Sequence, residues 1–99
     1  MSDPFASGDW KVSAGKEDEF IDRWREFLQW TRKTQPALIS ASLLRDADDP
    51  RHFLSFAQWS DEDARAAWKN GSDFSKYFSA CRALCDDMQG SNHDRVVTI

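Results

Sequence analysis

Five aromatic side chains and one histidine are the residues of this chain whose types and spacing best suit chemistry. The aromatic group consists of Trp59, Trp68, Phe74, Tyr77 and Phe78. The predicted elements bring these rings together where a strand meets a broken helix, so they could line a dry pocket for a flat apolar molecule. The indole N–H of Trp68 would be a hydrogen-bond donor there. His52 is the candidate base, because an imidazole titrates near neutral pH.

The same residues also fit a role without chemistry. Aromatic side chains at helical spacing are typical of a core, and His52 and His93 adjoin predicted turns, where side chains are commonly exposed. Cys81 and Cys85 form no CxxC motif, and both histidines lie on other elements. We therefore expect two reduced thiols and no metal site.

The composition predicts one small acidic domain over residues 1–99. The chain has 99 residues, five Trp, seven Phe and a net charge of −4. It has no run of Lys or Arg suited to a phosphate backbone or an anionic membrane, and no apolar run that could span a bilayer. The N-terminal residues lack the pattern of a signal peptide. We expect a cytoplasmic protein without nucleic-acid or membrane partners.

The first half of the sequence predicts two strands around one long helix. Phe5–Val12 alternates weakly, and acidic residues 17–19 favour a helix N-terminus. An apolar helical stripe follows at Phe20, Trp24, Phe27, Leu28 and Thr31. The helix ends at Gln35-Pro36, because the residue before a proline is pushed out of the helical region. Leu38–Arg45 is the second predicted strand.

The second half predicts a hairpin, a broken helix and a last strand. Residues 46–50 form a turn of Asp and Pro, so the next strand pairs with the one before it. Ser60 and Ser72 are the expected caps of the two helical pieces. The second piece has an apolar stripe of Phe74, Tyr77, Phe78, Cys81, Cys85 and Met88. Residues 90–92 end it, and Arg95–Ile99 is the predicted last strand.

The third strand, over residues 53–59, has apolar groups on both faces. One face holds Phe53, Ser55, Ala57 and Trp59, and the other holds Leu54, Phe56 and Gln58. A sheet covered by helices on one side normally shows polar residues on its other side. We therefore expect a second copy of the chain to cover the second face. The order β-α-β-β-α-β predicts an α+β, ferredoxin-like domain with a four-stranded antiparallel sheet and a broken second helix.

The chain also resembles the antibiotic biosynthesis monooxygenase family over nearly its whole length. The matching residues are Val12-x-x-Gly15-Lys16-Glu17-x-x-Phe20, Leu44-x-Asp46, Phe53-Leu54-Ser55-Phe56-x-x-Trp59-Ser60, Trp68 and Phe74. The resemblance implies a homodimer whose sheets pack face to face as a dimeric α+β barrel. It also implies a cofactor-independent monooxygenase that acts on an aromatic, polyketide- or quinol-like small molecule.

In that chemistry a deprotonated substrate passes an electron to dioxygen, and the protein supplies a dry pocket and oriented groups. Trp68 and His52 would be the catalytic residues. For the haem-degrading members, the position of the iron-ligating His holds Phe78, whose phenyl ring cannot ligate iron, so we expect no haem. The resemblance to cofactor-independent members implies no other cofactor. A non-catalytic small-molecule-binding or structural protein of the same fold is the competing prediction.

Overall fold

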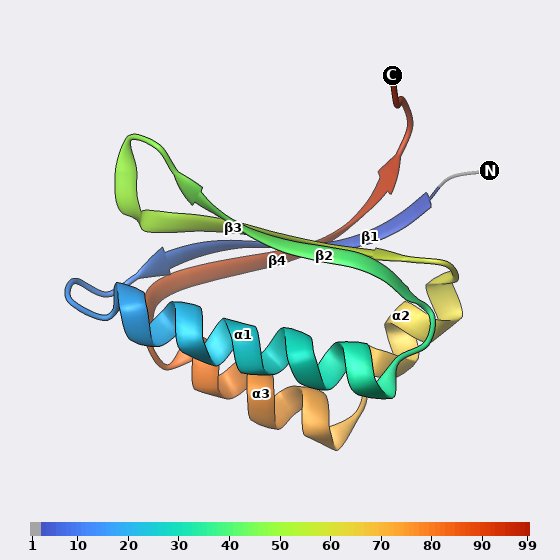
Figure 1. The fold of residues 1–99 in the computed structure, drawn as a ribbon, viewed down its shortest axis with the longest axis horizontal. Coiled ribbons are helices and arrows are strands. Elements are labelled where there is room, and N and C mark those ends of the chain that lie inside the picture. The colour runs from blue at the N-terminus through green and yellow to red at the C-terminus, as the bar shows by residue number, and fades with distance from the viewer. Residues whose placement is uncertain (1–2) are drawn as a thin grey trace.

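The computed structural model describes residues 3–99 (Figure 1). Its elements are β1 (Asp3–Val12), α1 (Glu17–Thr34), β2 (Leu38–Asp46), β3 (Asp49–Trp59), α2 (Glu62–Lys69), α3 (Ser72–Arg82) and β4 (Cys85–Arg95). The strands form a four-stranded antiparallel sheet in the order β2-β3-β1-β4. The predicted α+β, ferredoxin-like order is confirmed, with the second helical region split into α2 and α3.

The helices lie on one face of the sheet, and the opposite face carries no helix in the described chain (Figure 1). We call these the inner and the outer face. None of the helices in residues 3–99 is long and apolar enough to cross a membrane.

The long helix α1 forms where the sequence predicts it. Glu17, Asp18 and Glu19 occupy its first turn, and Arg32 and Lys33 its last, so the charges of both ends complement the helix dipole. The helix stops at Thr34, ahead of the proline. Its buried residues are Phe20, Trp24, Phe27 and Thr31. This stripe fixes which side of α1 faces the sheet.

Two tryptophans of the sheet join its inner face to the helices. Trp10 is 2% exposed, and its ring centroid lies 5.3 Å from that of Phe20 on α1 and 5.5 Å from that of Phe78 on α3. Trp59 is fully buried, with its ring centroid 4.9 Å from that of Trp68 on α2. Because these indoles stand at different places along the strands, they set the spacing between the two layers at both ends.

The end of the chain differs from the prediction. The helix expected to run to Met88 stops at Arg82, and Cys85 begins β4. The apolar residues at 81, 85 and 88 match helical spacing by chance. The segment after Arg82 is mostly polar and has no apolar alternation, but pairing with β1 from Asp3 to Val12 satisfies its backbone hydrogen-bonding groups. The strand predicted over Arg95–Ile99 is also wrong, because β4 ends at Arg95 and residues 96–99 leave the sheet (Figure 1).

Both predicted helix caps are wrong by one residue. Asp61, not Ser60, precedes α2, and its side chain accepts a hydrogen bond from the backbone N–H of Asp63. Gly71, not Ser72, precedes α3.

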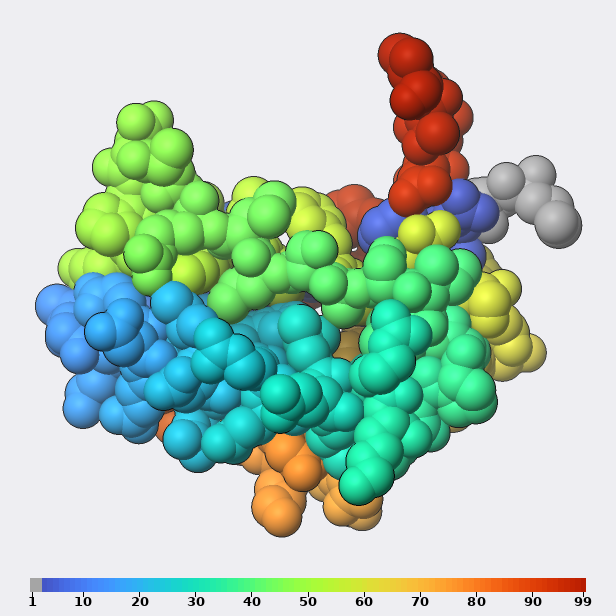
Figure 2. Space-filling model, in the orientation of Figure 1, coloured from blue at the N-terminus to red at the C-terminus, as the bar shows by residue number. Residues whose placement is uncertain are grey.

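The outer face carries apolar side chains that the chain itself leaves open to water. Phe56 on β3 is 38% exposed and Leu44 on β2 is 51% exposed. Val96 and Val97, just beyond β4, are 87% and 73% exposed. Figure 2 shows the β2–β3 hairpin and residues 96–99 rising on either side of this face. The two-sided character predicted for the third strand is therefore present in the structure.

Candidate functional site

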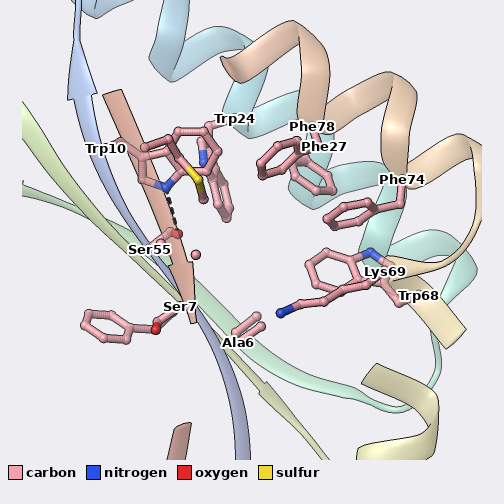
Figure 3. Close-up of a pocket in the computed structure, with 15 residues that line it drawn as sticks. Ala6, Ser7, Trp10, Trp24, Phe27, Ser55, Trp68, Lys69, Phe74 and Phe78 are labelled. Atoms are coloured by element: carbon pink, nitrogen blue, oxygen red, sulfur yellow. Dashed lines mark hydrogen bonds between the residues drawn. The ribbon is translucent and has the colours of Figure 1, made fainter. Parts of the chain in front are cut away.

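A cavity of about 290 Å³ lies between the inner face of the sheet and the helices (Figure 3). Small residues of the sheet form its floor: Ala6, Gly8, Ser55, Ala57 and Gly90. Large side chains form its walls: Trp10, Trp24, Phe27, Trp68, Lys69, Phe74, Phe78 and Met88. Ser7 and Phe56 also border the cavity, although the strand register turns their side chains toward the opposite face of the sheet. An aromatic cavity of this size suits a small flat molecule.

The cavity exists because small residues face one another across the strands. Gly8 pairs with Gly90 on one side and with Ser55 on the other. In the adjacent row that also points to the inner face, Ala6 pairs with Ala57. The rows on either side are large, since Trp10 pairs with Phe53 and Trp59 follows Ala57 on the same face. The large rows hold the helices away, and the small rows leave the space between them empty.

Hydrogen bonds within the protein occupy the indole N–H groups of two tryptophans of the cavity wall. The indole N–H of Trp10 donates to Ser55 Oγ at 3.0 Å, and that of Trp68 donates to Thr31 Oγ1 at 3.2 Å. The Nε1 atoms of Trp24 and Trp59 have no hydrogen-bond partner in residues 3–99. Both atoms are buried, so a ligand in the cavity cannot reach them. Trp68 therefore contributes its ring face to the cavity, while its N–H is already bonded.

The structure brings only part of the predicted site together. Trp68, Phe74 and Phe78 line the cavity, and the rings of Phe74 and Phe78 stack with centroids 5.4 Å apart. Trp59 is buried in the core and Tyr77 stacks on Trp30 at 4.8 Å, so neither belongs to the lining.

His52 is not at the cavity. It pairs with Lys11 in the register of β1 and β3, which places its side chain on the outer face, opposite to the cavity floor. Its Nδ1 lies 2.7 Å from Asp46 Oδ2, and its Nε2 lies 2.8 Å from Asp9 Oδ1. The expectation of a solvent-exposed histidine is met only in part, because its side chain is 28% exposed and tied to two carboxylates.

The two carboxylates change the protonation of His52. The hydrogen bond with Asp46, and then that with Asp9, raises the pKa of His52 above its ordinary value, since both nitrogens can donate only when the ring is charged. The same contact with His52 lowers the pKa of Asp46. The Asp9–His52–Asp46 group therefore links β1, β3 and β2 as a charged network on the outer face.

Sequence reasoning missed the floor of the cavity and Lys69. Ala6, Gly8 and Gly90 carry no functional side chain, so only the strand register reveals their role. Lys69 follows Trp68 on α2, and its side chain extends into the cavity toward Ala6 (Figure 3). A lysine in the last turn of a short helix gives no sequence signal for a ligand site, because it equally favours the helix dipole.

The cysteines lie outside the cavity. Burial raises the pKa of Cys81 to about 12 and that of Cys85 to about 11, so both thiols are poor nucleophiles. Across residues 3–99, no group of three or more His, Cys, Asp or Glu side chains is placed to hold a metal ion.

The fold and the cavity together place the chain among small α+β proteins that have a ferredoxin-like sheet and a ligand-sized pocket between the sheet and the helices. The sequence model described as "Antibiotic biosynthesis monooxygenase" matches residues 6–80. The chain belongs to the antibiotic biosynthesis monooxygenase family. No curated protein matches its sequence.

Solved structures share this fold at low sequence identity. A mutant of SnoaB, a cofactor-independent oxygenase from Streptomyces nogalater, superposes with a TM-score of 0.90 at 21% identity, covering 100% of this chain and 98% of that one. A structure described as an antibiotic biosynthesis monooxygenase gives 0.80 at 21% identity, covering 95% and 99%. A conserved protein from Methanosarcina mazei Go1 gives 0.83 at 15% identity, covering 94% and 92%.

Adding one methyl group at Gly8 should disturb the cavity floor. A Cβ there would lie 2.5 Å from Trp10 Nε1 and 2.8 Å from Ser55 Oγ, so the hydrogen bond between them must give way. We expect Gly8→Ala to lower the free energy of unfolding by about 1–3 kcal/mol, as overpacking does. Gly90→Ala is the matched control, because the nearest atom to its Cβ is the flexible end of Met88 at 3.3 Å, and the backbone oxygen of Ser7 lies at an ordinary contact distance of 3.9 Å. Urea unfolding followed by tryptophan fluorescence measures both, and equal stability of the two variants would contradict this account.

The charged network on the outer face should make stability depend on pH. Because the folded pKa of His52 is raised, its contribution is fully present below its unfolded pKa of about 6.5 and is lost as the pH rises through the folded value. The difference in melting temperature between the wild type and His52→Gln should therefore be largest at a mildly acidic pH, where His52 is charged and the carboxylates are still ionised. It should shrink as the pH rises toward ~9. A difference that grows with pH would refute the network.

Proposed function

We propose that the protein is a cofactor-independent monooxygenase that oxidises an aromatic, polyketide- or quinol-like small molecule in the cavity. The observation that carries the proposal is the aromatic cavity itself, in a chain of the antibiotic biosynthesis monooxygenase family. The likeness in fold to SnoaB, described as a cofactor-independent oxygenase, supports the reaction type. We place this activity in the cytoplasm, as the sequence predicts.

The proposed reaction takes its electrons from the substrate. A methylene group of a hydroxylated aromatic ring system loses a proton, and the resulting carbanion, delocalised as an enolate, passes an electron to dioxygen. The two radicals combine to a peroxide anion, which takes up one proton in place of the one lost, and loss of water from the hydroperoxide leaves a carbonyl. In balance, one CH₂ and one O₂ give one C=O and one H₂O.

The cavity contributes position and dryness to this reaction. Phe27, Trp68 and Phe74 surround one end, with the Trp68 and Phe74 ring centroids 4.7 Å apart, and a flat substrate would stack among such rings. Exclusion of water limits side reactions of the peroxide and strengthens the electrostatic interactions between the protein and the substrate anion. His52 takes no part, because it lies on the outer face.

Oxygen uptake tests the reaction. We expect the protein to accelerate O₂ consumption by 1,8-dihydroxyanthrone in the presence of EDTA and without added flavin, with one O₂ used for each methylene oxidised. Phe78→Ala should lower kcat/KM by about 10- to 100-fold, because a ring that positions the substrate is lost.

Tyr77→Ala is the matched control for this measurement. Tyr77 is the neighbouring half-buried aromatic residue of α3, but it does not line the cavity, so its removal should leave kcat/KM close to the wild-type value. Equal losses in the two variants, or no acceleration over the uncatalysed oxidation, would contradict the proposal.

A non-catalytic binding protein is the second candidate. The observation that favours it is that the cavity lining, among the described residues, contains no carboxylate and no imidazole to act as a base. Such a protein would bind the same aromatic molecules in the cavity without accelerating their oxidation.

We further propose that two copies pair through their outer faces. The exposed Leu44 and Phe56, and the apolar residues after β4, would then be removed from water, which is a favourable change of about 25 cal/mol per Å². The raised hairpin and residues 96–99 would frame the second sheet (Figure 2). The pairing leaves the cavity, on the inner face, within one chain.

Light scattering tests the pairing. The wild type should be a dimer at micromolar concentration, and Phe56→Glu should be monomeric, because it places a charge in the apolar interface. Gln29→Glu, on the exposed side of α1, adds the same charge to the helical side and should stay dimeric. A monomeric wild type would rule out the arrangement.

A further inference from the structure

Lys69 is the one charged side chain among the described residues that line the cavity. It comes from the last turn of α2, directly after Trp68, and its ammonium reaches the floor near Ala6 (Figure 3). Its Nζ donates to Asn92 Oδ1 at 2.5 Å. Asn92 pairs with Ala6 across β1 and β4, so the ammonium is held at the Ala6 end of the floor.

The charge of Lys69 has no counterion in the described part of the protein. Within residues 3–99, no carboxylate forms an ion pair with Lys69, whose one hydrogen-bond partner there is a neutral amide. Its neighbour Arg65 is also without an ion pair in this range and donates instead to the backbone oxygen of Phe5 at 2.9 Å. Two cations therefore stand near the same end of an apolar cavity without a balancing negative charge from these residues.

The surroundings of Lys69 make this imbalance costly. Lys69 is half-buried, and burial, followed by the nearby charge of Arg65, lowers the pKa of its ammonium. A charge removed from water is stabilised when it meets an opposite charge at hydrogen-bond distance. An anionic ligand in the cavity would supply that charge.

We propose that Lys69 is the residue that selects and orients the ligand, by pairing with the negatively charged oxygen of a planar aromatic anion held in the cavity. The inference rests on the proposed function, since it assumes that the cavity takes an aromatic molecule. It names the substrate class more narrowly: an acidic phenol or enol that binds as its monoanion, with its rings against Phe74 and Phe78 and its charged oxygen at Lys69. Lys69 is a positioning residue in this account.

The same contact bears on reactivity. A cation beside the oxygen stabilises the deprotonated substrate relative to the neutral one, and so raises the fraction of the ligand in the electron-rich form. Asn92 is the group that the ligand oxygen would replace on the ammonium, and it sits at the exposed edge strand, where its side chain has room to turn away.

A pair of probes matched in shape and differing in charge tests the proposal. 2-Naphthoate is an anion at neutral pH, and 2-naphthamide is neutral. Binding to the 99-residue chain is followed by quenching of tryptophan fluorescence, and intermolecular NOEs to the Phe78 ring locate each probe. The wild type should bind naphthoate more tightly than naphthamide. Lys69→Met should weaken naphthoate binding by about 10- to 100-fold, as expected for a lost charge-assisted hydrogen bond, and leave naphthamide unchanged.

Two further variants separate charge from packing. Lys69→Arg keeps the charge and should retain the preference for naphthoate. Lys76→Met removes a lysine of α3 that lies over the ring of Tyr77, outside the cavity lining, and should behave as the wild type.

The outcomes distinguish this inference from the function on which it rests. If both probes bind at Phe78 but Lys69→Met affects them equally or not at all, the role of Lys69 is refuted while the aromatic cavity stands. If neither probe binds in the wild type, the proposed aromatic cavity fails, and the role of Lys69 fails with it.

Discussion

The site depends on one packing constraint: two bulky rows of the sheet keep the helices away from two small rows. Trp10 reaches α1 and α3, and Trp59 reaches α2, so the two indoles act as spacers at either end of the floor. Protein interiors normally close over missing side chains, but rigid aromatic rings supported from both layers resist that closure. The empty space over Gly8 and Ala6 is thus a property of the whole sheet register, and the function proposed here follows from it.

The sheet separates two tasks on its two faces. The inner face holds the aromatic cavity and its single lysine, within one chain. The outer face holds the Asp9–His52–Asp46 network beside exposed apolar groups. Because adjacent residues of a strand point to opposite faces, a histidine that looks like a base for the site in the sequence lies on the far side of the sheet from it. The face of the sheet to which such a residue points decides its role more firmly than its residue type does.

The sequence predicts the parts of the fold whose patterns are strong. The apolar stripe of α1 and the proline that stops it each have a local physical cause, and both appear in the structure. The turn predicted over residues 46–50 also appears, but it is confined to residues 47–48, and Asp49 and Pro50 begin β3. The sequence did not predict β4, because its residues are mostly polar and only pairing with β1 makes it a strand. In the site, Trp68, Phe74 and Phe78 were foreseeable from clustering. The glycine floor and Lys69 were not, since they depend on register and on how α2 lies across the sheet.

β4 lies at an edge of the sheet, where backbone N–H and C=O groups lack a neighbouring strand. Such an edge invites another chain to add a strand, which is a common start of aggregation. Asp87 and Asp94 are exposed along this strand and repel a like-charged edge. The polar composition that makes β4 hard to predict from the sequence therefore opposes edge-to-edge aggregation of the folded protein.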